Sequence, residues 1–257
     1  MKFQSINPGK SISLFVKAIL VFEDDAIAQK KVLPFFADGY PGLIYQDTAN
    51  GLLVNPHNKM MPPLFLYGQT IMPIELVMEG PYKLIIFQLY PFVLKSLFNV
   101  LPGQVTDNCY DLQQVTSGTK LITALQESQS DDERIDLISK MLQSLFREKQ
   151  QHIDETIAFA IQKIIGNKGQ GTMREIFEAV HLTERTFERR FLTTVGISPK
   201  QFSRIIQFQQ SLEQLTLKDY NKLSDIVYEN GYADQSHFIK VFKAFTGKTP
   251  LAFRAGR

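Results

Sequence analysis

Two segments of the chain repeat one pattern of residues at a constant offset. The first runs from Phe187 to Phe202 and the second from Phe238 to Phe253. Each contains two phenylalanines four residues apart, then a glycine, a hydroxyl residue followed by proline, and a third phenylalanine. Residues four apart share one face of an α-helix, and glycine and proline typically end helices. The repeat therefore predicts two copies of one helical unit.

The first copy reads as a helix-turn-helix. Thr172 followed by Glu175 is a capping-box pattern, and it predicts a helix that continues to Ala179. Thr183 is placed to cap a second helix that ends near Thr194. A short turn between the two helices completes the unit.

The second copy has the same order of signals. A helix is expected over 223–229, followed by an Asn230-Gly231 turn. Asp234 is placed to cap a second helix that ends near Phe245. The two motifs are therefore expected at about residues 172–194 and 223–245.

The second helix of each motif leaves polar side chains on the face opposite its phenylalanines. These outward residues are Arg185, Thr186, Glu188 and Arg189 in the first motif, and Gln235, Ser236, His237 and Lys240 in the second. Such side chains can hydrogen-bond base edges and phosphates, and a helix that presents them suits the major groove of DNA. Solvated helical hairpins would show similar faces. The duplication and the matched basic positions, Arg189 and Lys240, favour DNA binding.

One helix is predicted between the two motifs, over residues 199–217. At 1.5 Å per residue it spans roughly 25–30 Å. A helix of that length could hold two recognition helices about one DNA turn, or roughly 34 Å, apart. We therefore expect them to enter successive major grooves on one side of the duplex.

The first part of the chain has a different pattern, with short apolar runs separated by glycine and proline. The expected strands cover residues 16–22, 43–45, 64–67, 74–78 and 83–89, and a short helix is expected over 91–101. Residues 1–118 are interpreted as a β-rich domain of barrel or sandwich type. A helical pattern over 119–150, in which Ser130 or Asp131 caps the second helix, predicts a linker, and residues 151–257 form the DNA-binding domain. The fold class is α+β multidomain.

Composition is that of a globular protein, with 44% hydrophobic and 21% charged residues. No apolar run approaches the ~20 residues of a membrane span, and we expect neither a leader nor a membrane association. The single cysteine, Cys109, fits a reducing cytoplasm. Residues 1–150 hold 13 basic and 15 acidic side chains, whereas 151–257 hold 15 and 11. The excess of positive charge in the second part is compatible with a polyanionic partner.

Catalytic and metal-binding patterns are weak in this sequence. None of the four histidines is paired at ligand spacing, so no metal site is expected. A nucleophile elbow and a phosphate-binding loop are both missing, and Cys109 is interpreted as a packed thiol. We therefore expect no enzyme and no cofactor. Aromatic residues of the β-rich part fit a ligand pocket or a packed core equally well, so no ligand-binding residue is assigned. These residues are Phe35, Phe36, Tyr40, Tyr45, Tyr67 and Tyr82.

The C-terminal motifs resemble those of AraC/XylS-type transcription regulators. The resemblance covers about residues 155–257 and is carried by the stretch GYADQSHFIKVFKAFTGKTP within residues 225–254, and upstream by LTERTFERRF at 182–191 and GISP at 196–199. It implies a bipartite DNA-binding domain with two recognition helices. The contacts that it implies fall on Arg185, Glu188 and Arg189 in the first helix, and on Gln235, Ser236, His237 and Lys240 in the second.

This chain departs from the family pattern at two positions. Gln207 stands where the family usually has an arginine, and Glu188 is acidic where many members have a neutral residue. Glu188 could accept a hydrogen bond from a cytosine amino group, or it could pair with Arg185 or Arg189 and orient it, which is the reading that we favour.

The β-rich part is similar to a domain that precedes this DNA-binding module in family members. The similar stretches are DGYPGLIY at 38–45, YGQT at 67–70 and FQLYPF at 87–92. The resemblance implies a promoter-binding regulator, most commonly an activator, that acts with RNA polymerase and responds to a small molecule or to self-association as a homodimer. The alternative is a small-molecule-binding β domain whose helical half docks a protein partner. The operator, the effector and the regulated genes lie beyond the sequence.

Overall fold

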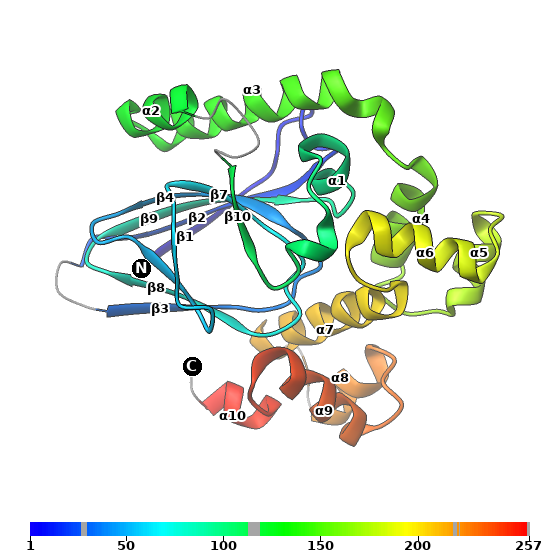
Figure 1. The fold of residues 1–257 in the computed structure, drawn as a ribbon. Coiled ribbons are helices and arrows are strands. Elements are labelled where there is room, and N and C mark those ends of the chain that lie inside the picture. The colour runs from blue at the N-terminus through cyan, green and yellow to red at the C-terminus, as the bar shows by residue number, and fades with distance from the viewer. Residues whose placement is uncertain (27–29, 113–118, 218–219, 221, 256–257) are drawn as a thin grey trace.

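The computed structural model describes residues 1–26, 30–112, 119–217, 220 and 222–255. Two antiparallel sheets lie one above the other, and helices cover one sheet and one end of the pair (Figure 1). The strands of the larger sheet, in spatial order, are β1 (Lys2–Ile6), β2 (Val16–Asp24), β9 (Tyr82–Leu89), β4 (Gly42–Thr48), β7 (Leu64–Tyr67) and β10 (Cys109–Asp111). Those of the smaller sheet are β3 (Lys30–Phe35), β8 (Ile74–Glu79), β5 (Leu52–Asn55) and β6 (Lys59–Met61).

The predicted α+β class is confirmed, with the β-rich part in its sandwich form. The described strands form two separate sheets and no closed barrel. The five predicted strands correspond to β2, β4, β7, β8 and β9. Strands β1, β3, β5, β6 and β10 were not predicted. Of these, β1 is an edge strand with largely exposed side chains, so it lacks the apolar pattern that marks a half-buried strand.

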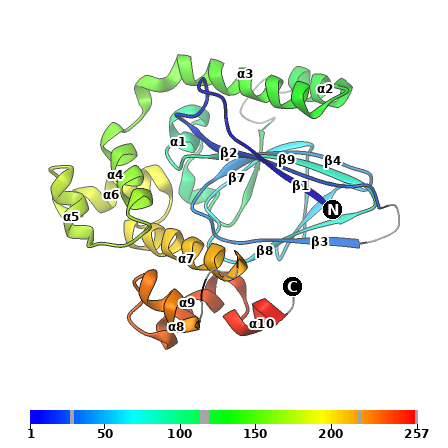
Figure 2. The ribbon, with the colours of Figure 1, turned by 180° about the vertical axis from the view of Figure 1, so that it is seen from behind.

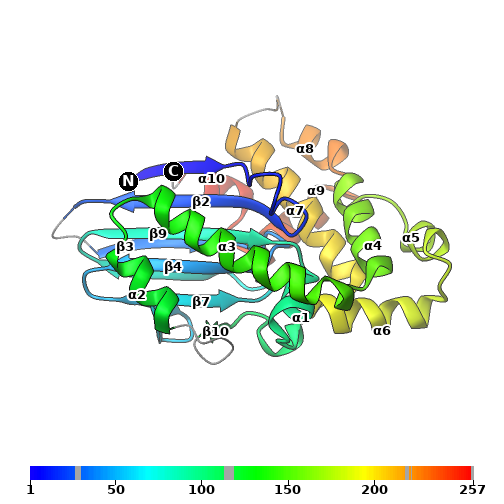
Figure 3. The same ribbon diagram turned by 90° about the horizontal axis from the view of Figure 1, so that it is seen from above.

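A helical layer lies on the outer face of the larger sheet. Helix α1 (Val93–Phe98) follows β9, and a short 3-10 turn, η1 (Pro102–Gln104), follows α1. Helices α2 (Thr119–Glu127) and α3 (Asp131–Lys149) run across the sheet (Figure 3). The Ser130 side chain accepts a hydrogen bond from the Glu133 amide, which confirms Ser130 as the cap of α3.

Among the described residues after α3, seven α-helices follow. They are α4 (Glu155–Gly166), α5 (Met173–Ala179), α6 (Glu184–Val195), α7 (Pro199–Leu217), α8 (Leu223–Glu229), α9 (Gln235–Thr246) and α10 (Pro250–Ala255). The pairs α5–α6 and α8–α9 are the two predicted helix-turn-helix motifs. Helix α7 has the predicted bounds and packs against helices of both motifs (Figure 2).

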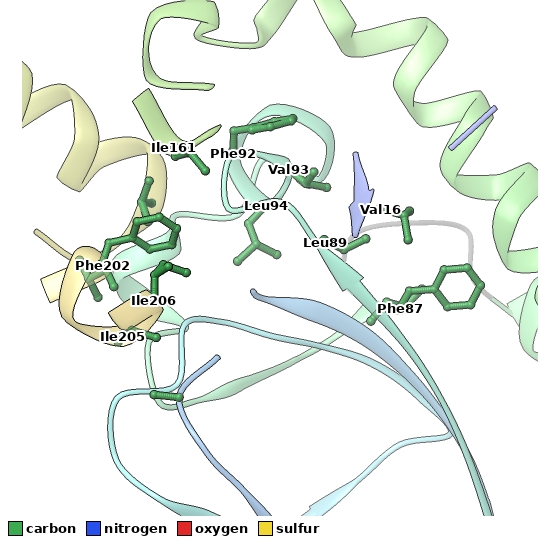
Figure 4. Packing of buried hydrophobic residues seen from close by; sticks show 14 of the residues in the cluster. Val16, Phe87, Leu89, Phe92, Val93, Leu94, Ile161, Phe202, Ile205 and Ile206 are labelled. Carbon is green, nitrogen blue, oxygen red and sulfur yellow. The ribbon is translucent and has the colours of Figure 1, made fainter. Parts of the chain in front are cut away.

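One hydrophobic core extends from the larger sheet into the C-terminal helices. In Figure 4, Leu94 of α1 lies between Leu89 of β9 and the α7 residues Phe202 and Ile206. The close approach depends on Gly39, since a Cβ there would lie 2.8 Å from Cδ1 of Ile206. The β sandwich and the C-terminal helices are therefore packed directly against each other.

Polar and aromatic contacts join the same two parts. The side-chain amide of Gln209 on α7 donates to the carbonyl oxygen of Ala37. Phe36, in the same loop as Ala37, stacks edge-on against Phe253 of α10, with ring centroids 5.7 Å apart. The loop between β3 and β4 is thus a principal contact between the sandwich and the helical half.

The described helices include none that is both long enough and apolar enough to cross a membrane.

Candidate nucleic-acid interface

Helix α6 is fixed at both ends and along one face. The Thr183 side chain accepts a hydrogen bond from the Thr186 amide at its start, and Gly196 ends it in the left-handed conformation at φ 90°. Phe187 and Phe191 are completely or almost completely buried. The burial of these two side chains fixes which face of α6 is turned toward the core. The opposite face, which carries the predicted DNA contacts, is therefore directed away from the core.

The predicted DNA-contacting residues of α6 differ in solvent exposure and in whether they already form hydrogen bonds. Arg185, Glu188 and Arg189 are exposed. The hydroxyl of Thr186 receives a hydrogen bond from the Thr183 hydroxyl at 3.0 Å, and Thr186 is only half-exposed. Thr186 therefore contributes to the start of the helix.

The ion pairing that we favoured for Glu188 is not present in the free protein. Among the ion pairs of the described residues, none includes Glu188, Arg185 or Arg189. Both arginines point away from the core without a carboxylate to hold them, so their guanidinium groups are available to an incoming anion.

Helix α9 repeats this construction. The Asp234 side chain accepts a hydrogen bond from the His237 amide at 2.7 Å, and Gly247 ends the helix in the left-handed conformation. Phe238 and Phe242 occupy the buried face. The predicted capping and termination signals of the second motif are thereby confirmed.

The predicted residues of α9 also fall into two groups. Gln235, Ser236 and Lys240 are exposed. The ring of His237 packs edge-on against Tyr232, with centroids 5.7 Å apart, and its Nδ1 is buried without a hydrogen-bond partner among the described residues. His237 is thus partly engaged in holding the turn before α9.

A groove of about 710 Å³ separates the first motif from α7 and the turn of the second motif. Two acidic residues of α6, Glu184 and Glu188, line one side, and Lys200 and Arg204 of α7 line the other. Both signs of charge therefore face this space, and the positive side belongs to the helix that joins the two motifs.

Two residues near the proposed interface, Arg190 and Gln207, make contacts that the sequence analysis did not predict. Arg190, next to Arg189, forms a two-point ion pair with Asp154, the cap residue of α4. Gln207 donates from its side-chain amide to the carbonyl oxygens of Asn230 and Gly231, in the turn of the second motif. Sequence spacing gives no direct signal for either contact, because the partners lie 36 and 23 or 24 residues apart.

The loop between β3 and β4, called the contact loop below, takes part in a small polar cluster of the β sandwich. The carboxylate of Asp38 accepts hydrogen bonds from the Tyr40 amide and from Nε2 of Gln88, at 2.9 and 2.6 Å. Desolvation raises the pKa of Asp38 to about 7, although these hydrogen bonds act to lower it. The Tyr67 hydroxyl and Oε1 of Gln69 are buried without a hydrogen-bond partner among the described residues.

Other candidate chemistry in the sandwich is limited. Tyr45, Tyr67 and Tyr82 are almost fully buried in the packed cores. Burial raises the pKa of the Cys109 thiol to about 11, which disfavours the reactive thiolate. Within the described part of the chain, no group of three or more His, Cys, Asp or Glu side chains could hold a metal ion.

Comparison with known proteins identifies a domain in the helical part of the chain. Residues 176–256 match the model of a helix-turn-helix domain. Over 81 residues the chain is 28% identical to the HTH-type transcriptional activator RhaS of Yersinia pestis, covering 32% of this chain and 29% of that protein. The chain carries an AraC-type helix-turn-helix domain. Residues 4–111, ahead of it, match a domain of unknown function, DUF6597.

The chain is also similar to other proteins. An uncharacterised HTH-type transcriptional regulator of Staphylococcus aureus strain MSSA476 is 27% identical over 86 residues, which cover 34% of this chain. The matched segment spans only 11% of the staphylococcal protein. Among solved structures, ToxT of Vibrio cholerae bound to a methylnaphthalenyl butenoic acid aligns with a TM-score of 0.49 and 12% identity, over 99% of each chain.

Proposed function

We propose that this AraC-type protein is a sequence-specific DNA-binding regulator of transcription. The observation that carries the proposal is the duplication of one recognition unit. Helices α6 and α9 each have a side-chain cap that accepts a hydrogen bond from the amide three residues on, the same spacing of two buried phenylalanines, and a left-handed glycine at the end. Arg189 and Lys240 stand at the same position of the two helices, and both are exposed.

The chemistry of each helix suggests a division of roles. Arg185 and Arg189 of α6 suit the O6 and N7 acceptors of guanine or the phosphate backbone, and Glu188 suits the amino group of cytosine. On α9, Gln235 suits adenine, Ser236 suits either a base or a phosphate, and Lys240 suits phosphate or guanine. We assign Thr186 and His237 to the edges of the proposed contact surface, because the side chains of both make local contacts within the motif.

The β sandwich is assigned the control of this activity. It senses a small molecule or brings two chains together, and either event acts on DNA binding only if it favours one arrangement of the two parts over another. The contact loop, through Phe36 and Ala37, provides a direct path for such coupling. We propose activation, in concert with RNA polymerase, as the outcome; the relative RhaS is named an activator.

The test is binding of the full chain to the DNA upstream of its own gene and neighbouring genes. Fluorescence anisotropy at several salt concentrations, with random DNA as competitor, measures both affinity and specificity. The proposal expects specific binding that weakens steeply as salt rises, because phosphate contacts release counterions. If the protein binds no DNA even at low salt, the proposal fails and the helical half is a protein-docking module.

A further inference from the structure

The turn of the second motif is attached to the first half of the domain by side-chain amides. Helix α8 ends at Glu229, and the last carbonyl groups of a helix have no partner within it. Three successive carbonyl oxygens here accept hydrogen bonds from outside the motif. Gln170 donates to Glu229 at 2.9 Å, and Gln207 donates to Asn230 at 2.8 Å and to Gly231 at 3.2 Å.

The two donors come from different places in the fold. Gln207 lies on α7, and Gln170 lies in the loop that leads directly into the first motif, two residues before the cap of α5. The side chain of Gln170 also covers Gly231, since a Cβ at Gly231 would lie 3.3 Å from its Cδ. The second motif is therefore hydrogen-bonded both to the connecting helix and to the entrance of the first motif.

The position of Gln170 is itself fixed against α7. A Cβ at its neighbour Gly169 would lie 2.2 Å from the carbonyl oxygen of Ser203 and 2.6 Å from the amide nitrogen of Gln207. Gly169 also has φ 72°, a conformation that glycine adopts without strain. The loop thus sits directly on the turn of α7 that carries Gln207, and this places the two amides side by side.

Further polar contacts continue along α7 toward its end. The buried amide of Asn230 donates to Oε1 of Gln214 at 2.7 Å and to the carbonyl of Ile226 at 2.9 Å. The hydroxyls of Ser211 and Tyr232 are 3.1 Å apart and buried. Hydrogen bonds are directional, whereas apolar packing is not, so this network restricts how the second motif can turn or slide on α7.

We propose that Gln170 and Gln207 are positioning residues that hold the two recognition helices at one separation, so that the protein reads the spacing between two DNA half-sites as well as their sequences. This inference rests on the proposed DNA binding. Gln207 stands at a position where the family usually has arginine, and here its uncharged amide donates to two neighbouring carbonyls. Neither residue needs to touch DNA.

The experiment uses the full chain and an operator that the wild-type protein itself selects from a random-sequence duplex library. Affinity is measured for that operator and for duplexes with one base pair inserted or removed between the two half-sites. One base pair rotates and displaces the second site, so the wild-type protein is expected to lose at least tenfold in affinity. Gln170→Met and Gln207→Met remove the donors at similar side-chain length, and Gln210→Met, on the same helix, is the control.

For both donor variants, the penalty for the altered spacing is expected to fall below threefold, while the control keeps the wild-type penalty. Hydrogen exchange provides a measurement without DNA: amides of residues 223–246 should exchange at least tenfold faster in the variants, and those of 173–195 should not change. Gln170 lies in an exposed loop, so Gln170→Met tests the proposal even if Gln207→Met does not fold. If Gln170→Met keeps the wild-type loss of affinity for the altered spacing, the positioning role is wrong but the proposed DNA binding still stands. A wild-type protein that selects no sequence overturns the proposed function as well.

Discussion

The guanidinium group of Arg190 forms a two-point ion pair with the carboxylate of Asp154. Nη2 lies 2.6 Å from Oδ1, and Nε lies 3.0 Å from Oδ2. The same carboxylate accepts a hydrogen bond from the Ile157 amide and caps α4. The Asp154 side chain therefore caps α4 and also binds α6 through Arg190, the sequence neighbour of Arg189.

The two roles of Asp154 can be separated by substitution. Asparagine is as good a helix cap as aspartate, but it carries no charge. We expect Asp154→Asn to lower the free energy of unfolding by about 1 kcal/mol and Asp154→Ala by about 2 kcal/mol, since alanine also removes the cap. Urea denaturation measures both values, and Asp132→Asn at the exposed start of α3 is the charge control. Equal losses for the two Asp154 variants would show that the cap contributes nothing.

The matched basic residues Arg189 and Lys240 provide a direct test of the recognition helices. Each alanine substitution is expected to weaken operator binding about tenfold, because each removes a base or phosphate contact. A variant that loses a phosphate contact should also show a salt slope smaller by about one. Thermal unfolding should be unchanged, since both side chains are exposed. Lys140→Ala, on α3, is the control, and unchanged affinity in both test variants would refute the groove assignment.

The two glycine stops of the repeat form a natural pair for testing how the sandwich packs on the first motif. Both Gly196 and Gly247 have positive φ, at 90° and 73°. A Cβ at Gly196 would lie 2.7 Å from the backbone carbon of Pro102, whereas at Gly247 the nearest atom, Cγ of Pro73, is 3.9 Å away. Gly247→Ala should cost about 1 kcal/mol of stability, and Gly196→Ala about 1–3 kcal/mol more. If urea denaturation gives similar losses in the free energy of unfolding for the two variants, the backbone around Pro102 can move to accommodate the added Cβ at no energetic cost.

The pKa of Asp38 predicts how stability depends on pH. Its value rises from an ordinary 3.8 to about 7 in the folded protein, so the folded state holds an extra proton between these two pH values. The contribution of Asp38 to stability is therefore complete below about pH 4 and is lost as the pH rises toward 7. Asp38→Asn should make the free energy of unfolding less dependent on pH across this window. An unchanged pH profile would exclude Asp38 as its source.

The repeat in the sequence predicted the helical part of the fold well, because its signals are local. Capping by Thr172, Thr183 and Asp234 and termination at Gly196 and Gly247 depend only on residues within one or two helical turns. The exposure of Arg189 and Lys240 follows from the same spacing. Local patterns of this kind determine which face of a helix is buried.

Several features that the sequence did not predict depend on tertiary contacts. Strand β1 has a mostly exposed side-chain pattern and forms only by pairing with β2. The partners of Arg190 and Gln207 come from other helices, and the pairing that we expected for Glu188 is replaced by exposure to solvent. The partly buried carboxylate of Asp38 likewise accepts a hydrogen bond from Gln88, which lies 50 residues away. Spacing along one chain carries no information on such pairs.

Footprinting of the full chain on its selected operator tests the central claim most directly. Hydroxyl-radical cleavage shows which nucleotides the protein covers. If α6 and α9 both enter the major groove from the two ends of α7, two protected segments should appear on one face of the duplex, centred about ten base pairs apart. Arg189→Ala should weaken protection of one segment and Lys240→Ala that of the other. A single protected segment, or protection that neither substitution changes, would contradict the account of two recognition helices.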